Sequence, residues 1–373
     1  MTDGPGSGMV MASSGGDNIL DDAAAMARAD SEDMLGQVAA LPTRVTEGWH
    51  IARELQLPWE PPRSVAVLGM GGSAIGAELV QGIWGDRISV PMAVQRGYEL
   101  PAWVGPGTLV IASSKSGATE ETLRQLETAL ARRCPVVCVT TGGALANVAR
   151  ATGLPLATFP DRGSPRAAVG WSMGIVAGIL ERAGVLELDE AEVEAGVGSV
   201  SATLRRCVPS VPTAENPAKQ LAWSLVDRFV MVNAAGFLAP VARRWKTQLN
   251  ENSKAAAAFE ELPEATHNTV VGFEQPESLR DHLAVIFLRS SLDHPRNLLR
   301  AQLVGDVVET AQIWHSFVEA EGEGRLGHAL SLMVAGDFTS VYLAFMYAID
   351  PTPIDVISHI KQQLALADQA GAE

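Results

Sequence analysis

A carboxylate, an amine and an imidazole stand close together in residues 250–268, as Glu251, Lys254 and His267. A carboxylate and an imidazole in one site suit an isomerisation in which a base moves a proton between two adjacent carbons while an acid/base acts on a neighbouring oxygen. Glu and Lys are also common on ordinary solvent-exposed helices, so composition alone favours a plain surface. Their chemistry depends on the elements that position them.

The Ala run at 255–258, with Lys and Glu around it, predicts a helix over residues 251–261 that ends before Pro263. Glu251 would begin this helix, and His267 would lie in the loop beyond its end. At 1.5 Å per residue the helix would rise roughly 15 Å. His267 must therefore either fold back across that length to reach Glu251 or serve the site of a partner chain.

Hydroxyl groups gather at a second place, where Ser114, Ser116 and Thr119 surround Gly117. This loop follows a predicted strand at 108–112 and opens a predicted helix at 120–131. Ser and Thr before a helix are usually only caps. Three hydroxyls around one glycine exceed what capping requires, and together with the free N–H groups of a helix N-terminus they predict a site for a phosphomonoester.

A glycine-rich loop at 69–76 carries the pattern Gly69-x-Gly71-x-x-Ala74, a loose dinucleotide-binding fingerprint. An NAD site would require Asp or Glu at the end of the second strand, but the strand predicted at 88–94 continues into Gln95 and Arg96. NAD is therefore disfavoured, and NADP would be accommodated only through Arg96. A tight turn that requires glycine explains the loop about as well as a ligand does.

Short apolar strands alternate with helices over residues 65–159 and, more weakly, over 229–318. This alternation predicts an α/β protein of two doubly wound domains, each a mainly parallel sheet flanked by helices. We expect a disordered leader at 1–17, an N-terminal domain at 18–205 and a C-terminal domain at 206–373. Further predictions are two amphipathic helices within 19–57, a strand at 269–273 and two C-terminal helices at 326–348 and 351–366.

The composition excludes several classes of protein. The net charge of -15 argues against binding to nucleic acid or to an anionic membrane surface. No apolar stretch reaches transmembrane length, and the 3 cysteines are too few for a disulfide framework and lack zinc-site spacing. A cytoplasmic location is expected.

Several strings of this chain closely resemble the bifunctional phosphoglucose/phosphomannose isomerases, a branch of the sugar isomerase (SIS) fold. The resemblance includes the loops at 69–76 and 114–119, the run Glu-Leu-Pro-Glu-x-x-His-Asn at 261–268, and segments at 164–168, 240–246, 336–344 and 350–353. It extends in order over about residues 20–366. The chain departs from the family at Lys115 and Ala118, where Tyr and Asn are usual, and at Thr269, where Glu is common.

The resemblance implies an aldose–ketose isomerase that interconverts glucose 6-phosphate and/or mannose 6-phosphate with fructose 6-phosphate through an enediol, without a metal or organic cofactor. It further implies a homodimer whose active site lies at the interface. Arg166 would stabilise the enediolate, Glu251 would be the base, and His267 with Lys361 would open the sugar ring. Substrate-binding residues would be Gly72, Ser73, Ser114, Ser116, Thr119 and Thr352, the last for tolerance of either C2 configuration.

A non-catalytic sugar-phosphate sensor or regulatory partner is the alternative. The altered residues Lys115 and Ala118 favour it. The retention of Glu251, Arg166, His267 and Lys361 together favours chemistry.

Overall fold

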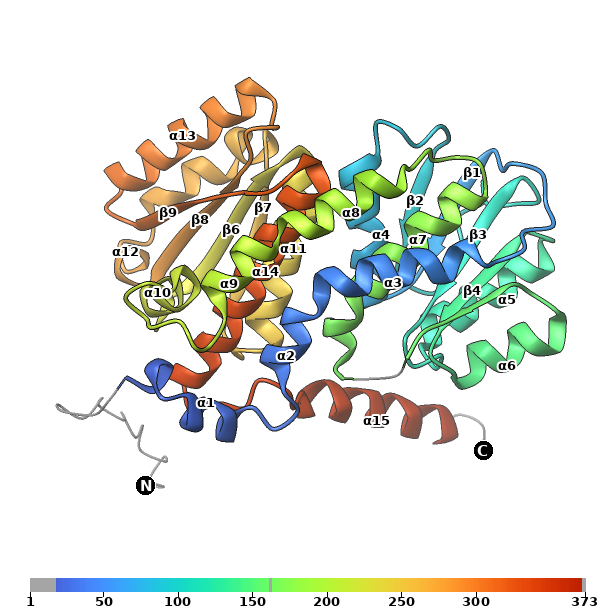
Figure 1. Ribbon diagram of the computed structural model, residues 1–373, viewed down its shortest axis with the longest axis horizontal. Helices are drawn as coiled ribbons and strands as arrows, with labels where there is room; N and C mark the ends of the chain where they lie inside the picture. Colours follow the sequence, from blue (N-terminus) through green and yellow to red (C-terminus); the bar gives the residue numbers. More distant parts are fainter. Residues whose placement is uncertain (1–17, 161–162, 371–373) are drawn as a thin grey trace.

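The computed structural model describes residues 18–160 and 163–370. The leader expected at 1–17 lies outside these residues. Figure 1 shows two sheets side by side, one in the N-terminal half and one in the C-terminal half, each covered by helices. The predicted α/β architecture with two parallel sheets is confirmed.

The N-terminal sheet has the strand order β2-β1-β3-β4-β5, and every pairing in it is parallel. Strands β3 and β4 are buried along their whole length, because helices cover both faces. Its strands are β1 (Ser64–Leu68), β2 (Met92–Gln95), β3 (Thr108–Ser113), β4 (Val136–Thr140) and β5 (Leu156–Thr158). Its helices are α4 (Gly71–Trp84), α5 (Glu120–Ala131), α6 (Gly143–Thr152) and α7 (Val169–Arg182).

The C-terminal sheet has four parallel strands in the order β7-β6-β8-β9. Its strands are β6 (Phe229–Ala235), β7 (Ala257–Leu262), β8 (Leu283–Arg289) and β9 (Trp314–Glu319), and its main helices are α10 (Pro217–Leu225), α11 (Ala239–Glu251), α13 (Pro295–Thr310) and α14 (Gly324–Met346). Among the described residues, α14 alone is long and apolar enough to cross a membrane. Its most apolar window is 89% buried inside the protein, as in the core helix of a soluble protein.

The remaining elements connect or flank the sheets. Residues 19–57 form η1, α1, α2 and α3 rather than two helices, because the carboxylate of Asp30 accepts hydrogen bonds from Met34 and Leu35 N–H and interrupts the helical run. The bounds are η1 (Ile19–Asp21), α1 (Ala23–Ala29), α2 (Met34–Ala39), α3 (Leu41–Arg53), η2 (Pro165–Ala168), α8 (Glu190–Ser199), α9 (Ser201–Cys207), η3 (Gly236–Leu238), η4 (Glu264–His267), η5 (Thr269–Glu274), α12 (Leu279–His282) and α15 (Asp355–Ala370).

The prediction of a helix over residues 251–261 is wrong. Glu251 ends helix α11 instead of starting a helix, and residues 257–262 form strand β7. The helix lies upstream because Val241, Ala242, Trp245 and Leu249 provide a buried apolar stripe at helical spacing. The Ala run joins the sheet because it pairs in register with β6 from Val230↔Ala257 to Ala235↔Leu262, so tertiary pairing overrides its helix propensity.

The strand predicted at 269–273 is also wrong, because these residues belong to the 3₁₀ helix η5. The Asn268 side chain accepts a hydrogen bond from Thr269 N–H and starts this turn. Only Phe273 of the segment is buried, and Val271 is 69% exposed. The segment therefore crosses the surface instead of entering the sheet.

Helices α4 and α11 lie antiparallel between the two sheets. At one end Gly72 and Glu251 line the same cleft. At the other end a Cβ added to Gly82 would lie 3.1 Å from Cγ of Pro240. Because each helix runs antiparallel to the strands it follows, the carboxyl edge of the N-terminal sheet lies beside the amino edge of the C-terminal sheet, where the candidate site is found.

Candidate active site

Two loops meet at the carboxyl edge of the N-terminal sheet, because β1 and β3 are neighbours with Leu68 opposite Ala112. The first loop enters α4 at Gly71 and carries Gly72 and Ser73 in the first turn. Gly69 lies so close to the second loop that a Cβ on it would be 3.0 Å from the Ser113 carbonyl oxygen. The two predicted substrate-binding loops are thus side by side.

The hydroxyl loop is held in shape by its own contacts. Ser114 Oγ and Thr119 Oγ1 share a hydrogen bond of 2.7 Å, and Ser116 Oγ accepts one from Ala118 N–H at 3.3 Å. Gly117 has a φ of +64°, which favours glycine. Neither α4 nor α5 has a side-chain hydrogen bond at its N-cap, so the first N–H groups of both helices remain for an anion.

Lys115, one of the departures from the family, extends toward the segment that precedes Arg166. Its ammonium donates to the Gly163 carbonyl at 2.9 Å. The lysine therefore links the hydroxyl loop to the segment that enters η2. Gly72 also lies close to this segment, because a Cβ on it would be 2.9 Å from the Pro165 carbonyl oxygen.

Arg166 is a deeply buried charged group of the site, with 3% of its side chain exposed. Its Nε donates to Asn252 Oδ1 at 2.5 Å, and its Nη2 donates to the carbonyls of Pro351 and Thr352 at 2.6 and 3.0 Å. Its Nη1 has no hydrogen-bond partner among the described residues and lies 3.6 Å from Glu251 Oε2. Burial lowers the pKa of Arg166, and the carboxylate of Glu251 opposes this effect.

Arg166 is itself held by a buried ion pair that the sequence analysis did not identify. Arg244 pairs with Asp337, each with 1% of its side chain exposed, and Arg244 Nη1 donates to the Arg166 carbonyl at 3.1 Å. Burial raises the pKa of Asp337, and Arg244 opposes this. Arg244 lies in the segment at 240–246 and Asp337 in the segment at 336–344, both of which carry the family resemblance. That resemblance was the signal in the sequence that could have identified them.

Lys254 is a further residue to which the sequence analysis assigned no role. Its ammonium donates to the carbonyls of Glu251, Asn252, Asp350 and Pro351, at 2.9, 3.3, 3.1 and 2.9 Å. It therefore ties the end of α11 to the segment that precedes α15. Partial burial lowers its pKa, and the Arg166 guanidinium lowers it further.

A cleft of about 190 Å³ lies between α4 and α11, and Glu251 and five Arg and Lys side chains line it, in a chain whose net charge is -15. Arg96 and Arg243 pair with Glu78, and Arg244 pairs with Asp337, so the positive charges still outnumber the carboxylates. Such a local excess of positive charge suits an anionic ligand. The cleft is lined by Gly71, Gly72, Ile75, Arg96, Arg166, Arg243, Arg244, Lys246, Thr247, Gln248, Glu251 and Phe259.

Unsatisfied polar atoms also mark the site. Gln248 Oε1, Thr352 Oγ1 and Arg166 Nη1 are buried without a hydrogen-bond partner among the described residues. Buried polar atoms are normally paired, because leaving one unpaired costs about 1–3 kcal/mol. Gln248 and Arg166 line the cleft, and Thr352 contacts Arg166, so these unpaired atoms point to a ligand that completes their hydrogen bonds.

The structure brings together the substrate-binding candidates of the two loops, and it places the Thr352 carbonyl against Arg166. It does not bring His267 or Lys361 to them. His267 follows β7, whereas Glu251 precedes it, and a six-residue strand separates the two by roughly 20 Å at 3.3 Å per residue. Glu251 and His267 are therefore separated along the chain, as predicted, but by strand β7 and not by a helix.

Lys361 is exposed on α15. This helix starts three residues after Thr352 and extends along the lower side of the N-terminal half in Figure 1. Lys361 lies about 9 Å along the helix axis from Asp355, at 1.5 Å per residue.

The chain is similar to known proteins over most of its length. The family described as the bacterial phospho-glucose isomerase C-terminal SIS domain matches residues 214–364. The bifunctional phosphoglucose/phosphomannose isomerase of Caldicellulosiruptor bescii is 34% identical over 89% of this chain and 99% of its own length. The protein of the same name from Aquifex aeolicus is 31% identical over 86% of this chain and 97% of its own length.

Solved structures support the fold. A hypothetical protein from Thermus thermophilus has a TM-score of 0.74 and 18% identity, covering 94% of this chain and 95% of its own. A glucose-6-phosphate isomerase-like protein from the same organism has a TM-score of 0.57 and 21% identity, covering 88% of this chain and 99% of its own. With relatives above 30% identity along nearly their whole length, the chain belongs to the bifunctional phosphoglucose/phosphomannose isomerase family.

Proposed function

We propose that this protein is an aldose–ketose isomerase that interconverts glucose 6-phosphate and mannose 6-phosphate with fructose 6-phosphate through an enediol intermediate. The observation that carries the proposal is the pair of Arg166 and Glu251. A buried guanidinium nitrogen without a hydrogen-bond partner among the described residues lies 3.6 Å from a carboxylate oxygen, in a cationic cleft beside the two glycine and hydroxyl loops.

The chemistry follows from these positions. The hydroxyls of Ser73, Ser114, Ser116 and Thr119 and the N–H groups at the starts of α4 and α5 bind the phosphate. Glu251 takes the proton from one of the two adjacent carbons, C1 or C2, and returns it to the other. Arg166 stabilises the negative charge that develops on the enediolate oxygens, and it is held in place before the reaction by Asn252 and two carbonyls.

One enediol serves both aldoses, because glucose and mannose 6-phosphates differ only at C2, the carbon that loses its configuration in the intermediate. The Thr352 hydroxyl, buried without a hydrogen-bond partner among the described residues, is the group that we assign to contact the sugar on either face of C2.

The direct test is conversion of fructose 6-phosphate by the purified protein, with both aldose products resolved by NMR. The Glu251→Gln variant should lose about 10²–10⁴-fold in kcat, the usual contribution of a general base. Glu260→Gln, on strand β7, is the matched control and should keep its activity. Undiminished turnover in Glu251→Gln would contradict the assignment of the base, and tight binding of fructose 6-phosphate by the wild type without either product would favour the sensor.

The proposal includes a homodimer in which His267 acts in the partner's site. An exposed apolar surface next to His267 supports this. On α13, Leu299, Leu303 and Val307 are 46%, 53% and 41% exposed at a spacing of one helical turn, and Val271 of η5 is 69% exposed. Hollows of about 700 and 310 Å³ lie between this helix and the η4–η5 segment. A second copy that covers this surface would come close to His267.

Complementation tests this arrangement. Glu251→Gln and His267→Ala chains, co-expressed with different tags, form a heterodimer in which one site has both functional residues only if His267 acts in the partner's site. Recovery of roughly a quarter of wild-type activity in the statistical mixture is expected for a twofold-symmetric dimer. If both residues act within one chain, every site lacks one of them and the mixture stays inactive.

Two further parts of the proposal concern organisation and location. The division into domains at 18–205 and 206–373 is supported by one sheet on each side of this boundary. A cytoplasmic location is supported by the reaction, because its phosphorylated sugars are intracellular metabolites.

A further inference from the structure

Lys254 has a backbone conformation that lysine rarely adopts. Its φ is +56°, in the left-handed region, two residues after Asn252, the C-cap of α11. Glycine is the usual residue in this conformation at the end of a helix, because it has no Cβ to be crowded. A residue with a side chain loses about 1–2 kcal/mol there. A lysine at this position therefore indicates that its side chain has a use.

The ammonium of Lys254 is surrounded by main-chain carbonyls, which we call the carbonyl cage. The oxygens of Glu251 and Asn252 lie 2.9 and 3.3 Å from Nζ, and those of Asp350 and Pro351 lie 3.1 and 2.9 Å from it. An ammonium has three N–H groups, so four oxygens exceed its donors. They surround it as a shell of carbonyl dipoles surrounds a small cation.

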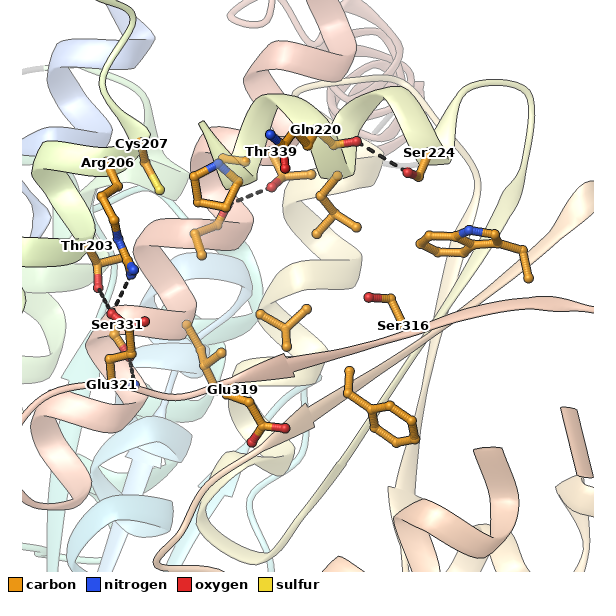
Figure 2. A pocket seen from close by; sticks show the side chains of 18 residues that line it. Thr203, Arg206, Cys207, Gln220, Ser224, Ser316, Glu319, Glu321, Ser331 and Thr339 are labelled. Atoms are coloured by element: carbon orange, nitrogen blue, oxygen red, sulfur yellow. Dashed lines mark hydrogen bonds and ion pairs between the residues drawn. The ribbon is translucent and has the colours of Figure 1, made fainter. Parts of the chain in front are cut away.

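All four acceptors in the carbonyl cage are uncharged. Figure 2 shows the opposite arrangement in the hollow of about 400 Å³ beside β9, where Arg206 binds the carboxylate of Glu321. Carbonyls hold a cation without neutralising it, so Lys254 keeps its positive charge for its surroundings. Two of the four carbonyls, those of Glu251 and Asn252, belong to the end of α11, where the helix macrodipole is negative. The ammonium offsets this negative end beside the residue that we assign as the base.

Lys254 also shares its contacts with Arg166. The Pro351 carbonyl accepts from Arg166 Nη2 at 2.6 Å and from Lys254 Nζ at 2.9 Å. Asn252 contacts both cations as well, because its Oδ1 accepts from Arg166 Nε at 2.5 Å and its carbonyl accepts from Lys254 at 3.3 Å. Removing the ammonium would free the 350–351 segment from the end of α11, and Arg166 would then shift relative to Glu251.

We propose that Lys254 is a positioning residue for the isomerisation and that its ammonium fills a cation site formed by the carbonyl cage. The first part rests on the proposed function, in which Glu251 moves the proton and Arg166 stabilises the enediolate. Lys254→Gly separates the ammonium from the backbone, because glycine suits a φ of +56°. Lys254 is exposed, so a small cation from solvent can enter the emptied cage of this variant.

Steady-state kinetics with fructose 6-phosphate tests the positioning role. Lys254→Gly should lower kcat by roughly 10²-fold, the usual effect of a displacement of about 1 Å in a site. The KM should change much less, because the hydroxyl loop is untouched. Arg133→Gly is the matched control, since Arg133 has a φ of +57° just after α5 and does not line the cleft. A kcat of Lys254→Gly within about threefold of wild type, an equal loss in Arg133→Gly, or a rise in KM alone would overturn the proposal.

Ammonium ions test the carbonyl cage without depending on the reaction. In Lys254→Gly, ammonium chloride at about 0.2 M should raise the melting temperature by about 3 °C more than tetramethylammonium chloride does, because only the smaller ion fits the cage. The same salt should restore kcat at least about tenfold. Wild type and Arg133→Gly should respond equally to both salts.

An equal response of Lys254→Gly to both salts would overturn the cation site. A wild type that makes neither aldose would refute the proposed function and with it the positioning role, and the melting temperatures would still decide whether the carbonyl cage binds a cation.

Discussion

Replacing Arg166 by Lys separates the charge at the site from the geometry that positions it. The guanidinium makes three hydrogen bonds from two nitrogens, to Asn252 Oδ1, Pro351 O and Thr352 O. A lysine ammonium at the end of a flexible chain keeps the charge but cannot hold this planar fork. At least one charged hydrogen bond is lost, worth about 1.5–3 kcal/mol, and Nη1 no longer has a fixed position near Glu251.

The expected effect on catalysis is a fall in kcat of about 10²–10³-fold, the usual loss when one fixed donor to a developing oxyanion is removed. The KM for fructose 6-phosphate should change much less, because the hydroxyl loop that we assign to the phosphate is untouched. Steady-state kinetics in the direction of glucose 6-phosphate measures both values.

Arg132→Lys is the matched control. Arg132 also donates to three backbone carbonyls, those of Pro101, Val104 and Leu100, but it does not line the cleft. It should lower the melting temperature while it leaves kcat unchanged. The reasoning is refuted if Arg166→Lys keeps kcat within about threefold of wild type, or if Arg132→Lys loses kcat to the same extent.

Three other predictions concern the loops and the surface. Gly117→Ala should raise the KM for fructose 6-phosphate at least about tenfold, because Gly117 has a φ of +64° and a Cβ on it would lie 1.9 Å from the Gly142 carbonyl oxygen. Gly105→Ala is the control and should leave the KM unchanged, because no atom lies within 4 Å of a Cβ at that position. Burial raises the pKa of Asp293 to about 6, so its ionisation lowers the stability of the folded protein as the pH rises from 3.8 through 6. Asp293→Asn should therefore raise the melting temperature at pH 7.5 but not at pH 4, and an equal change at both would contradict this. Leu303→Asp should shift the protein toward monomer in analytical ultracentrifugation, and an unchanged sedimentation profile would exclude α13 from the interface.

The sequence by itself determined the parts of the protein that depend on local pattern. The apolar run at 108–112, which is predicted to be a strand, is buried on both faces of a parallel sheet as part of β3. The hydroxyl loop was identifiable for a similar reason, because Ser114, Ser116 and Thr119 lie within six residues and their contacts are local.

Only the tertiary structure decided what residues 251–262 become. Their Ala-rich composition favours a helix, but pairing with β6 offers the backbone a full set of sheet hydrogen bonds, and this outweighs a propensity of a few tenths of a kcal/mol per residue. The same pairing places Glu251 before β7 and His267 after it. The contacts of Arg166 with Asn252 and Thr352 join residues 86 and 186 positions apart, and no local pattern records such distances.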